Sequence, residues 1–549
     1  MINKKYILAL ILISLIIIIF KNHNLNTRYI LNQFSYSANG PFPKIEILEK
    51  IHDKIDEYTN KEKTSNNLAL AFNLESKKKT DKFKSLFSTN SNQNFGISFH
   101  DAKMRFRKNN TNLPKPKINF NLESNKNDWQ SFQILIVPFN NDIEGIEIEV
   151  LNSQFQMEAF IGEYVFCKKP AYKTENIGWY VDPLIPLTVK QNKESITFID
   201  KIYPLKIKKY ENKSIWFNIH TGENTFSGKY ELPIKIKINN EEQIAILNLN
   251  VNDKTLNHEK KFKDFFGFSE HALVRWNDFN SNLIKSKRKD YYDFLLKYNL
   301  NPTNLYSRST WPPIEDWEYC INKGANLFNI SYLNEKSDII RLDSIIKIIY
   351  ERNYQDHGVL YGFDEIESNK YDQLIEQLKE YQKLSQRLPF LCTTIPNNKL
   401  LKYVDVFIPR YDNINNSLSM ENKDNWTYIC NVNTEKKLNF FIDYPLENIE
   451  KLALEIKHKK FDGFLYYSLN DWNENILIDS LKKNPFVKIN KKNIDLYKKG
   501  IKWPYQDWNS FSYRNYNGDG CIVYPGFNGE VWPSVRLIQI REMLTILNN

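Results

Sequence analysis

The chain has 549 residues, a length that allows two or three domains of about 100–200 residues each. Its 75 basic and 65 acidic residues give a net charge of +10 that is spread without a long basic block, which excludes nucleic-acid binding as the organising function. The five cysteines are widely spaced and form no CxxC or Cys/His cluster, so the sequence predicts neither a zinc site nor any other metal or cofactor.

The first 24 residues have the pattern of a targeting segment. Lys4 and Lys5 precede an apolar run over residues 6–20. This run is shorter than the roughly 20 residues of a typical membrane span, so a cleaved signal peptide and an uncleaved signal anchor both stay open. In either case we expect the body of the protein to enter the secretory pathway and to be lumenal, extracellular or secreted, with membrane attachment through residues 6–20 if the segment is retained.

Residues 25–95 are polar and lysine-rich, which predicts a stalk or linker with a short helix over residues 44–58 and a loop over residues 76–94. From residue 96 to residue 255, short alternating segments are separated by Asn, Asp and Gly turns. Regularly spaced short strands of this kind predict a β-sandwich accessory domain.

From residue 256 to residue 490, short apolar runs alternate with amphipathic stretches, which predicts an α/β fold with a (β/α)8 barrel like that of triosephosphate isomerase. Residues 491–549 are expected to pack on the barrel or to add β structure. The expected strands cover residues 265–268, 305–307, 327–332, 359–363, 390–394, 404–409, 438–442 and 464–468, and the expected helices cover 284–298, 337–353, 370–384 and 446–459.

The fourth expected strand ends abruptly in two adjacent carboxylates, Asp364 and Glu365. Carboxylates are costly in an apolar core, so the pair is expected where the strand emerges at the carboxyl-terminal rim, the place where barrel active sites are built. Adjacent strand residues face opposite sides, and both acids can reach one substrate only if the backbone bends there. Capping of the following helix is the structural alternative for these acids.

Acids, amides and aromatic residues also follow most of the other expected strands. Such a collection suits a sugar site, because carboxylates transfer protons, polar groups bind hydroxyls and an aromatic ring packs on the apolar face of a pyranose. These residues are Glu270, His271, Arg308, Tyr332, Asn334, Arg410, Tyr411, Asp412, Asp443, Tyr444, Asn470, Asp471 and Trp472.

Several motifs in this order resemble one known family, the domain of unknown function 4091, which overlaps glycoside hydrolase family 123. The resemblance covers roughly residues 115–541, and the ordered set of motifs is more specific than any single one. The motifs are WYVDPL (179–184), GKY (228–230), YGFDE (361–365), FIDYP (441–445), DGFLYYSLNDW (462–472), GDG (518–520), YPG (524–526) and PSVRL (533–537).

The resemblance implies an exo-acting, retaining β-N-acetylgalactosaminidase or a relative, with a glycoconjugate or polysaccharide as its substrate. In that mechanism the 2-acetamido oxygen of the substrate attacks the anomeric carbon, and the enzyme supplies no nucleophile. Glu365 would be the general acid and then the general base, and Asp364 would bind the acetamido N–H and stabilise the oxazolinium intermediate. The candidates for sugar binding are Arg410, Tyr411, Asp443, Tyr444, Asn470 and Trp472, with Trp472 expected to stack.

Alternatives stay open at this stage. Asp443 could be the nucleophile of an ordinary double-displacement glycosidase with Glu365 as acid/base. The chain could also be a non-catalytic glycan-binding or cell-surface protein on a hydrolase scaffold. A metal-dependent hydrolase using His271 is a weaker third reading, and the sequence does not distinguish N-acetylgalactosamine from N-acetylglucosamine.

Overall fold

A computed structural model describes residues 62–87, 93–108, 113–167, 178–192, 194–256, 260–277, 280–413, 424–430, 438–472, 511–513 and 516–549. The expected targeting segment and the expected helix over 44–58 lie outside these residues. Among the helices of the described part of the chain, none is both long and apolar enough to span a membrane.

The first described element is the helix α4 (Glu62–Phe87), so the expectation of a loop over 76–94 is wrong for most of that stretch. Although the sequence of this helix is mostly polar, one of its residues makes a buried apolar contact with the following domain. Phe83 is buried, and its ring lies 6.4 Å from that of Phe139 in the neighbouring domain. This contact fixes the end of α4 against the β-sheets that follow.

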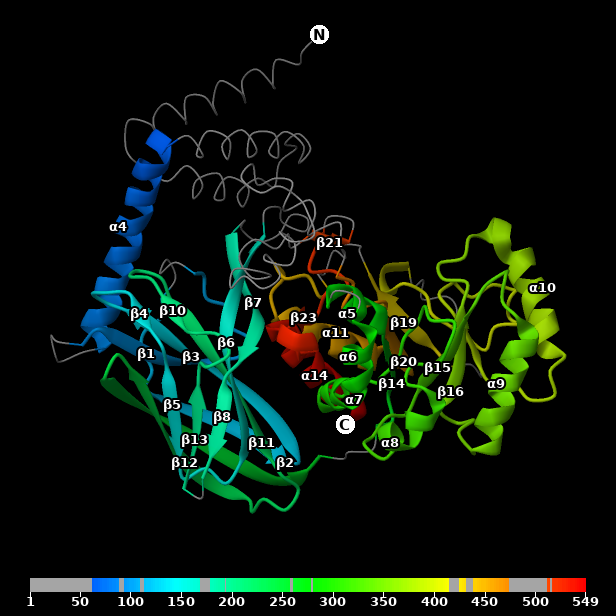
Figure 1. The fold of residues 1–549 in the computed structure, drawn as a ribbon, viewed down its shortest axis with the longest axis horizontal. Helices are drawn as coiled ribbons and strands as arrows, with labels where there is room; N and C mark the ends of the chain where they lie inside the picture. Colours follow the sequence, from blue (N-terminus) through cyan, green and yellow to red (C-terminus); the bar gives the residue numbers. More distant parts are fainter. Residues whose placement is uncertain are drawn as a thin grey trace, which may run out of the picture.

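The next domain consists of two antiparallel-rich sheets whose inner faces share aromatic contacts, such as the ring pair Phe198–Phe217 at 6.1 Å. Figure 1 shows the sheets stacked on one side of the molecule. One sheet has the order β1 (Phe95–Asp101), β3 (Asp128–Pro138), β11 (Lys213–Thr221), β6 (Gln156–Cys167) and β7 (Gly178–Pro186). The other has the order β2 (Asn119–Lys126), β13 (Glu241–Thr255), β12 (Gly228–Ile238), β5 (Glu147–Leu151), β9 (Ser195–Ile199) and β8 (Thr188–Gln191), and β4 (Ile143–Glu144) pairs with β10 (Lys206–Ile207).

The second domain has parallel strands in two groups. One group has the order β14 (Lys263–Phe266), β20 (Gly463–Tyr466), β19 (Trp426–Ile429), and the other the order β15 (Phe328–Leu333), β16 (Gly358–Gly362), β17 (Phe390–Cys392), β18 (Val406–Phe407). The mixed α/β class expected from the sequence is therefore confirmed. The α-helices of this domain are α5 (Glu270–Trp276), α6 (Ser281–Ser286), α7 (Arg288–Lys297), α8 (Trp317–Ile321), α9 (Ile339–Glu351), α10 (Tyr371–Gln382), α11 (Glu447–His458) and α14 (Val535–Asn548).

Short 3-10 turns and two hairpins complete the described residues. The turns are η2 (Ile314–Asp316), η3 (Ser368–Lys370), η4 (Tyr411–Asn413) and η5 (Phe527–Gly529), and the hairpins pair β21 (Phe511–Tyr513) with β22 (Tyr516–Asn517) and β23 (Tyr524–Pro525) with β24 (Val531–Trp532).

Backbone contacts connect the two groups of parallel strands at both ends. Parallel bridges join Phe407 to Asn425 and Arg410 to Tyr428, which links β18 to β19. On the other side, Phe268 N donates to Thr303 O at 2.9 Å, and Tyr332 N donates to Ser307 O at 2.7 Å. Residues 303–307 therefore bridge β14 and β15, although they are not assigned as a strand.

The expected strand over 438–442 is wrong, and the strand at that place in the chain order is β19 (Trp426–Ile429). Residues 438–442 are buried but have no ladder partner among the described strands. Phe440 instead packs against Phe464 and Tyr466, with ring distances of 6.0 and 5.0 Å. A fully buried apolar run looks the same in a strand and in a buried loop, which explains the error.

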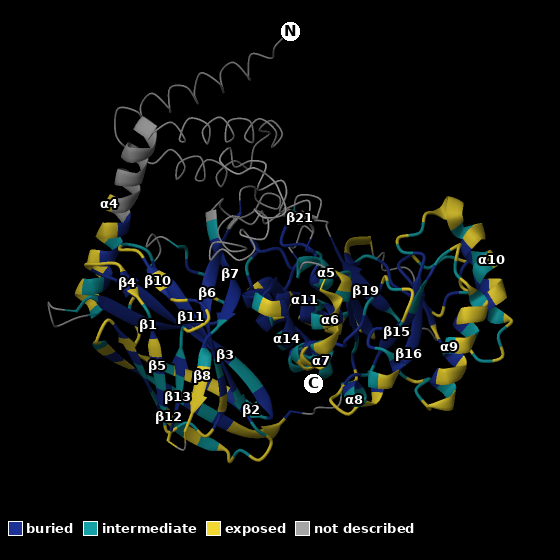
Figure 2. Ribbon diagram, viewed as in Figure 1, coloured by how far each residue is buried: buried dark blue, intermediate teal, exposed yellow. Residues whose placement is uncertain are grey.

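One compact group of side chains, here called the inner cluster, draws on all the parallel strands and on residue 305. It is separate from the larger core between strands and helices, and Figure 2 shows the strands β15 and β16 buried inside exposed α9 and α10. Its members are Phe265, Leu305, Leu327, Val359, Tyr361, Leu391, Val406, Ile408, Trp426, Tyr428, Cys430 and Leu465, with Tyr332 and Tyr467 packed against it.

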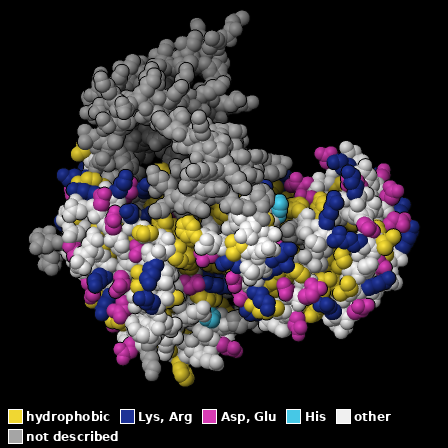
Figure 3. Space-filling view, in the orientation of Figure 1, with side chains coloured by type: hydrophobic (Ala, Val, Ile, Leu, Met, Phe, Trp, Pro, Cys, Tyr) yellow, Lys and Arg dark blue, Asp and Glu magenta, His cyan; other side chains and the backbone are white. Residues whose placement is uncertain are grey.

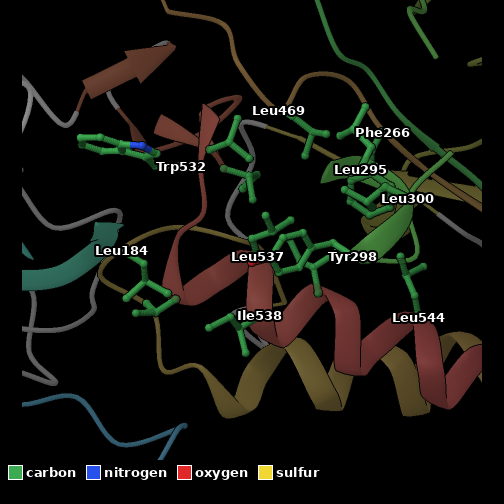
Figure 4. Close-up of a cluster of buried hydrophobic side chains, with 14 of the residues drawn as sticks. Leu184, Phe266, Leu295, Tyr298, Leu300, Leu469, Trp532, Leu537, Ile538 and Leu544 are labelled. Carbon is green, nitrogen blue, oxygen red and sulfur yellow. The ribbon is translucent and has the colours of Figure 1, made fainter. Parts of the chain in front are cut away.

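The helix α14 joins the two domains. It lies between the sheets of the first domain and the parallel strands of the second (Figure 1), and α11 packs along it. Figure 4 shows Leu537 and Leu544 on the side of α14 that faces Tyr298, and Leu184 of β7 near its start. Leu184 N donates to Pro533 O at 2.9 Å, so the first domain is attached directly to the residues that begin this helix.

A buried ion pair lies at the same junction. Arg536 and Asp182 are both fully buried, and Arg536 Nη2 lies 2.8 Å from Asp182 Oδ2. The remaining guanidinium hydrogens of Arg536 reach the carbonyl oxygens of Phe440, Gly518 and Cys521. Arg536 thus connects β7 to the loops beside β19 and β20, and its N–H donors are satisfied by the Asp182 carboxylate and three backbone carbonyl oxygens.

Candidate active site

The backbone turns sharply where β16 ends. Phe363 and Glu365 both have φ of +47°, a left-handed conformation that non-glycine residues seldom adopt. Asp364 lies between them, so the regular alternation of side chains is broken at the acid pair. The bend that the sequence required for both acids to reach one space is confirmed.

Asp364 is held by three hydroxyl groups. Its Oδ1 accepts from Tyr361 Oη at 2.5 Å and from Thr393 Oγ1 at 2.7 Å, and its Oδ2 accepts from Tyr306 Oη at 3.0 Å. Its backbone N–H donates to Tyr332 Oη at 3.2 Å. A carboxylate has about four acceptor positions, so one position on Oδ2 is left for a further donor.

Glu365 is more open than Asp364. Its side chain is exposed, and its Oε1 accepts from Tyr428 Oη at 2.8 Å and lies 3.8 Å from Cys430 Sγ. Within the described residues, no hydrogen bond reaches Oε2 of Glu365. One carboxyl oxygen is therefore oriented by the protein and the other can meet a ligand.

Thr393, directly after β17, connects the two acids. Its hydroxyl donates to Asp364 and accepts from the backbone N–H of Glu365 at 2.7 Å. One side chain therefore fixes the carboxylate of the first acid and the backbone of the second.

Both acids lie over the same inner cluster. Tyr361, which donates to Asp364, and Tyr428, which donates to Glu365, are members of that cluster. Neither carboxylate forms a salt bridge with any residue described by the structure. The acids are thus anchored by hydroxyl groups at one end of the parallel strands rather than neutralised by cations.

Aromatic rings surround the pair. The rings of Tyr306 and Tyr332 lie 5.7 Å apart, and those of Tyr332 and Tyr361 lie 5.9 Å apart. Burial and the Asp364 carboxylate raise the pKa of Tyr306, so it stays a neutral donor, although the residue as a whole is 45% exposed. Burial and the nearby Cys430 and Glu365 also raise the pKa of Tyr428. The site therefore combines fixed neutral donors with an accessible aromatic surface.

Arg410 and Tyr411, two of the predicted sugar-binding residues, point in different directions. Arg410 pairs with Asp412 at 2.5 Å and forms a backbone bridge with Tyr428, the donor to Glu365. Tyr411 is buried and donates to Glu455 of α11 at 2.8 Å. Arg410 therefore lies near the acid pair, whereas the Tyr411 hydroxyl is turned toward the surrounding helices.

Asn470 and Trp472 have structural contacts instead of an open face. Asn470 is fully buried, and its amide both accepts from Ser269 N at 2.8 Å and donates to Ser269 O at 3.0 Å. Trp472 is 4% exposed, donates to Val523 O at 3.0 Å, and packs edge-on against Trp276. The expectation that Trp472 stacks on a sugar is not supported, because no ring face is exposed.

Asp443 and Tyr444 are placed at the junction between the domains. Asp443 is buried and accepts from Asn517 at 3.1 Å, and Tyr444 packs with Phe441 at a ring distance of 5.0 Å. Arg105, which precedes the second strand of the first domain, donates to the carbonyl oxygen of Tyr444 at 3.0 Å. These residues were assigned to the rim because 438–442 was taken for a strand, and the structure does not bring them to Glu365.

The sequence reasoning missed Tyr306, Thr393 and Tyr428. Thr393 could have been found, since it immediately follows the short apolar strand β17. Tyr428 belongs to β19, a strand of only four residues that was not predicted from the sequence, so its position near Glu365 was not expected.

A second buried acid, Asp519, lies behind the site. Its Oδ1 accepts from Tyr466 Oη at 3.0 Å, and burial raises its pKa from 3.8 to about 7. Asp519 also contributes to raising the pKa of Cys430, the thiol beside Glu365. It is fully buried, so it acts on the packing of this region rather than on a ligand directly.

The comparisons with known proteins agree with this arrangement. Residues 340–547 match the family model described as glycoside hydrolase 123, catalytic domain. A family 123 glycoside hydrolase from Clostridium perfringens, studied for glycolipid glycan hydrolysis, has a similar structure, with a TM-score of 0.57 and 13% identity over 82% of this chain and 87% of that chain. No curated protein matches the chain.

Other solved structures resemble only part of the chain. The sporulation control protein Spo0M from Bacillus subtilis gives a TM-score of 0.15 at 8% identity over 30% of this chain and 51% of that chain. A beta-glucosidase from Listeria innocua gives 0.14 at 10% identity over 31% of this chain and 17% of that chain. These two likenesses carry no functional argument.

The family match over residues 340–547, together with the acid pair, supports a glycoside hydrolase, and the structural similarity shows the same fold. The matched stretch, which is similar to the catalytic domain of glycoside hydrolase family 123, includes Asp364, Glu365, Thr393 and Tyr428. The resemblance seen in the sequence motifs is thereby confirmed.

Proposed function

We propose that the protein is a retaining, exo-acting hydrolase that removes a β-linked N-acetylhexosamine, with N-acetylgalactosamine favoured, by substrate-assisted catalysis. The main support for this proposal is the difference in hydrogen bonding between two adjacent acids. Asp364 accepts hydrogen bonds from three hydroxyl groups, whereas Glu365 has one carboxyl oxygen open to a ligand. We place this pair at the mouth of a (β/α)8 barrel formed by the parallel strands and residues 303–307. The backbone contacts between β18 and β19 and between β14 and β15 support that ring.

Glu365 is assigned the proton transfers. Its exposed Oε2 can donate a proton to the glycosidic oxygen and later take one from water, while Tyr428 holds Oε1 in place. Proton transfer by a positioned carboxyl group typically contributes about 10²–10⁴-fold to the rate. The order of events requires the glycosidic bond to break as the substrate's acetamido oxygen bonds to the anomeric carbon, and water then to open the oxazolinium ring.

Asp364 is assigned the acetamido group. Its remaining acceptor position can take the acetamido N–H, which holds the carbonyl oxygen near the anomeric carbon and stabilises the positive charge that develops. The three hydroxyl donors keep the carboxylate from rotating during this step. The exposed Tyr306 replaces Trp472 as the proposed surface for the sugar.

An ordinary double displacement with Asp443 has no support, since Asp443 is buried at the domain junction and bonded to Asn517. The remaining alternative is a glycan-binding protein without turnover, which the experiment below separates from an enzyme.

The test compares wild type and Glu365→Gln on two chromogenic β-galactosides that differ only in a 2-acetamido or a 2-hydroxyl group. We expect wild type to cleave the acetamido substrate alone, Glu365→Gln to lose about 10²–10⁴-fold in kcat/KM, and a thiazoline analogue of the intermediate to inhibit. Equal cleavage of both substrates would refute the acetamido mechanism. Binding of the sugar with no turnover by wild type would favour the binding protein.

A further inference from the structure

An open cavity of about 510 Å³, counting the solvent at its mouth, lies beside the proposed active site. It is formed by the end of β15, the beginning of α9 and the loop that contains Arg308. Arg308 lines it from one part of the chain and Lys336 and Arg341 from another, together with the single carboxylate of Asp338. Leu333 and Leu360 form part of its apolar wall.

Tyr332 connects this cavity to the acid pair. Tyr332 is one of the residues that line the cavity, and its hydroxyl accepts from the backbone N–H of Asp364 at 3.2 Å. Its ring lies 5.7 Å from that of Tyr306, the proposed sugar surface. The cavity and the acid pair therefore have Tyr332 as a common neighbour, which suits a cavity that takes the sugar on the far side of the scissile bond.

The charges of the cavity are unbalanced. In the described part of the chain, Arg308, Lys336 and Arg341 make no salt bridge, whereas Lys347, farther along α9, pairs with Asp343 at 2.6 Å. The carboxylate of Asp338 is already used at the helix start, where its Oδ1 accepts from the backbone N–H groups of residues 340 and 341 at 3.0 and 3.1 Å.

Figure 3 shows that Lys and Arg on the visible face are interspersed with Asp and Glu. Three exposed cations that converge on one cavity are a different arrangement, because their mutual repulsion falls when an anion binds between them. The planar guanidinium groups of Arg308 and Arg341 each match the two oxygens of a carboxylate or a sulfate ester.

From the cavity, its charge and its link to the acid pair, we infer that it binds an anionic group on the sugar next to the one released. The substrate class is then an acidic glycan whose penultimate residue carries a carboxylate or a sulfate ester. This inference rests on the proposed function for its position in the reaction, but the anion site itself can be tested without turnover.

The kinetic test uses three disaccharides in which the same β-N-acetylhexosamine is linked to galactose, to sulfated galactose or to glucuronic acid. We expect wild type to cleave at least one acidic disaccharide about tenfold better in kcat/KM than the neutral one, which corresponds to about 1.4 kcal/mol. The double variant Arg308→Gln/Arg341→Gln should lose this preference and keep its rate on the neutral disaccharide within about twofold.

Arg352→Gln is the matched control, because Arg352 is exposed at the other end of α9 and does not line the cavity. It should behave as wild type. Circular dichroism of the double variant checks that it is folded, and a rising salt concentration should reduce the preference for the acidic disaccharide in wild type alone.

Calorimetry with free sulfated galactose and free glucuronic acid separates this inference from the proposed function. Binding by wild type and Arg352→Gln but not by the double variant supports the anion site, even if no disaccharide is cleaved. Cleavage of the neutral disaccharide with neither acidic preference nor binding of either free sugar overturns the anion site and leaves the glycosidase proposal standing. The better of the two free sugars identifies the anion as sulfate or carboxylate.

Discussion

Replacing Thr393 by valine tests whether the two acids work as one unit. The substitution keeps the branched shape but removes a hydroxyl that donates to Asp364 at 2.7 Å and accepts from Glu365 N at 2.7 Å. A hydrogen bond to a charged group contributes about 1.5–3 kcal/mol, and each 1.36 kcal/mol is tenfold in rate, which gives an expected loss of about 10- to 150-fold in kcat.

The lower end of that range is the better expectation, because Tyr361 and Tyr306 still donate to Asp364 in the variant. The free energy of unfolding should fall by only about 1 kcal/mol, since Glu365 is exposed and water can satisfy part of the lost backbone contact. Activity should therefore drop far more than stability.

The assay measures kcat and KM on a chromogenic 2-acetamido β-galactoside, with urea unfolding of the same preparations. The matched control is Thr394→Val at the adjacent position, where the hydroxyl lies 3.4 Å from Tyr371 Oη and touches neither acid. A Thr393→Val variant whose kcat stays within about twofold of the Thr394→Val variant would refute the idea that Thr393 holds the pair.

Two further substitutions address the junction between the domains and the buried acid behind the site. Arg536→Met leaves the Asp182 carboxylate buried without its cation, and the free energy of unfolding measured in urea should fall by about 3–5 kcal/mol. Arg536→Lys should restore little of this stability, because an ammonium lacks the planar guanidinium group that contacts several acceptors at once. Near-wild-type stability of either variant would contradict the role assigned to Arg536. The raised pKa of Asp519, about 7 against an ordinary 3.8, means that folded protein keeps a proton there that unfolded protein releases. Wild-type stability should therefore fall relative to Asp519→Asn as pH rises from about 4 to 7, and parallel stability curves for the two proteins across that range would show that Asp519 is not protonated in the fold.

The sequence contains enough information to place the acid pair. The apolar run through residue 363 ends in Asp364 and Glu365, and the requirement that both acids face one ligand predicts the bend that the φ values of Phe363 and Glu365 display. The alternation of strands and helices likewise predicts β14 to β18, β20 and the helices α7, α9, α10 and α11 to within a few residues.

The surroundings of the pair depend on contacts that no local pattern reveals. Trp472 follows a strand as a sugar-stacking residue would, yet it is buried because the chain after β20 folds back, where Asn470 bonds to the backbone of Ser269. Residues 438–442 form a longer apolar run than β19, but tertiary packing makes the shorter segment the strand. The two errors have the same cause, since burial alone does not say which neighbour a residue is buried against.

The position of α14 constrains the order in which the molecule can fold. The two-sheet domain leaves the ribosome first, but the guanidinium that neutralises its buried Asp182 belongs to Arg536, more than 350 residues later in the chain. The wall of helices around the parallel strands is also incomplete until residues 535–548 have been synthesised. The interior is therefore completed only after residues 535–548 have been synthesised, and expressing the two-sheet domain without Arg536 would leave the Asp182 carboxylate without its cation.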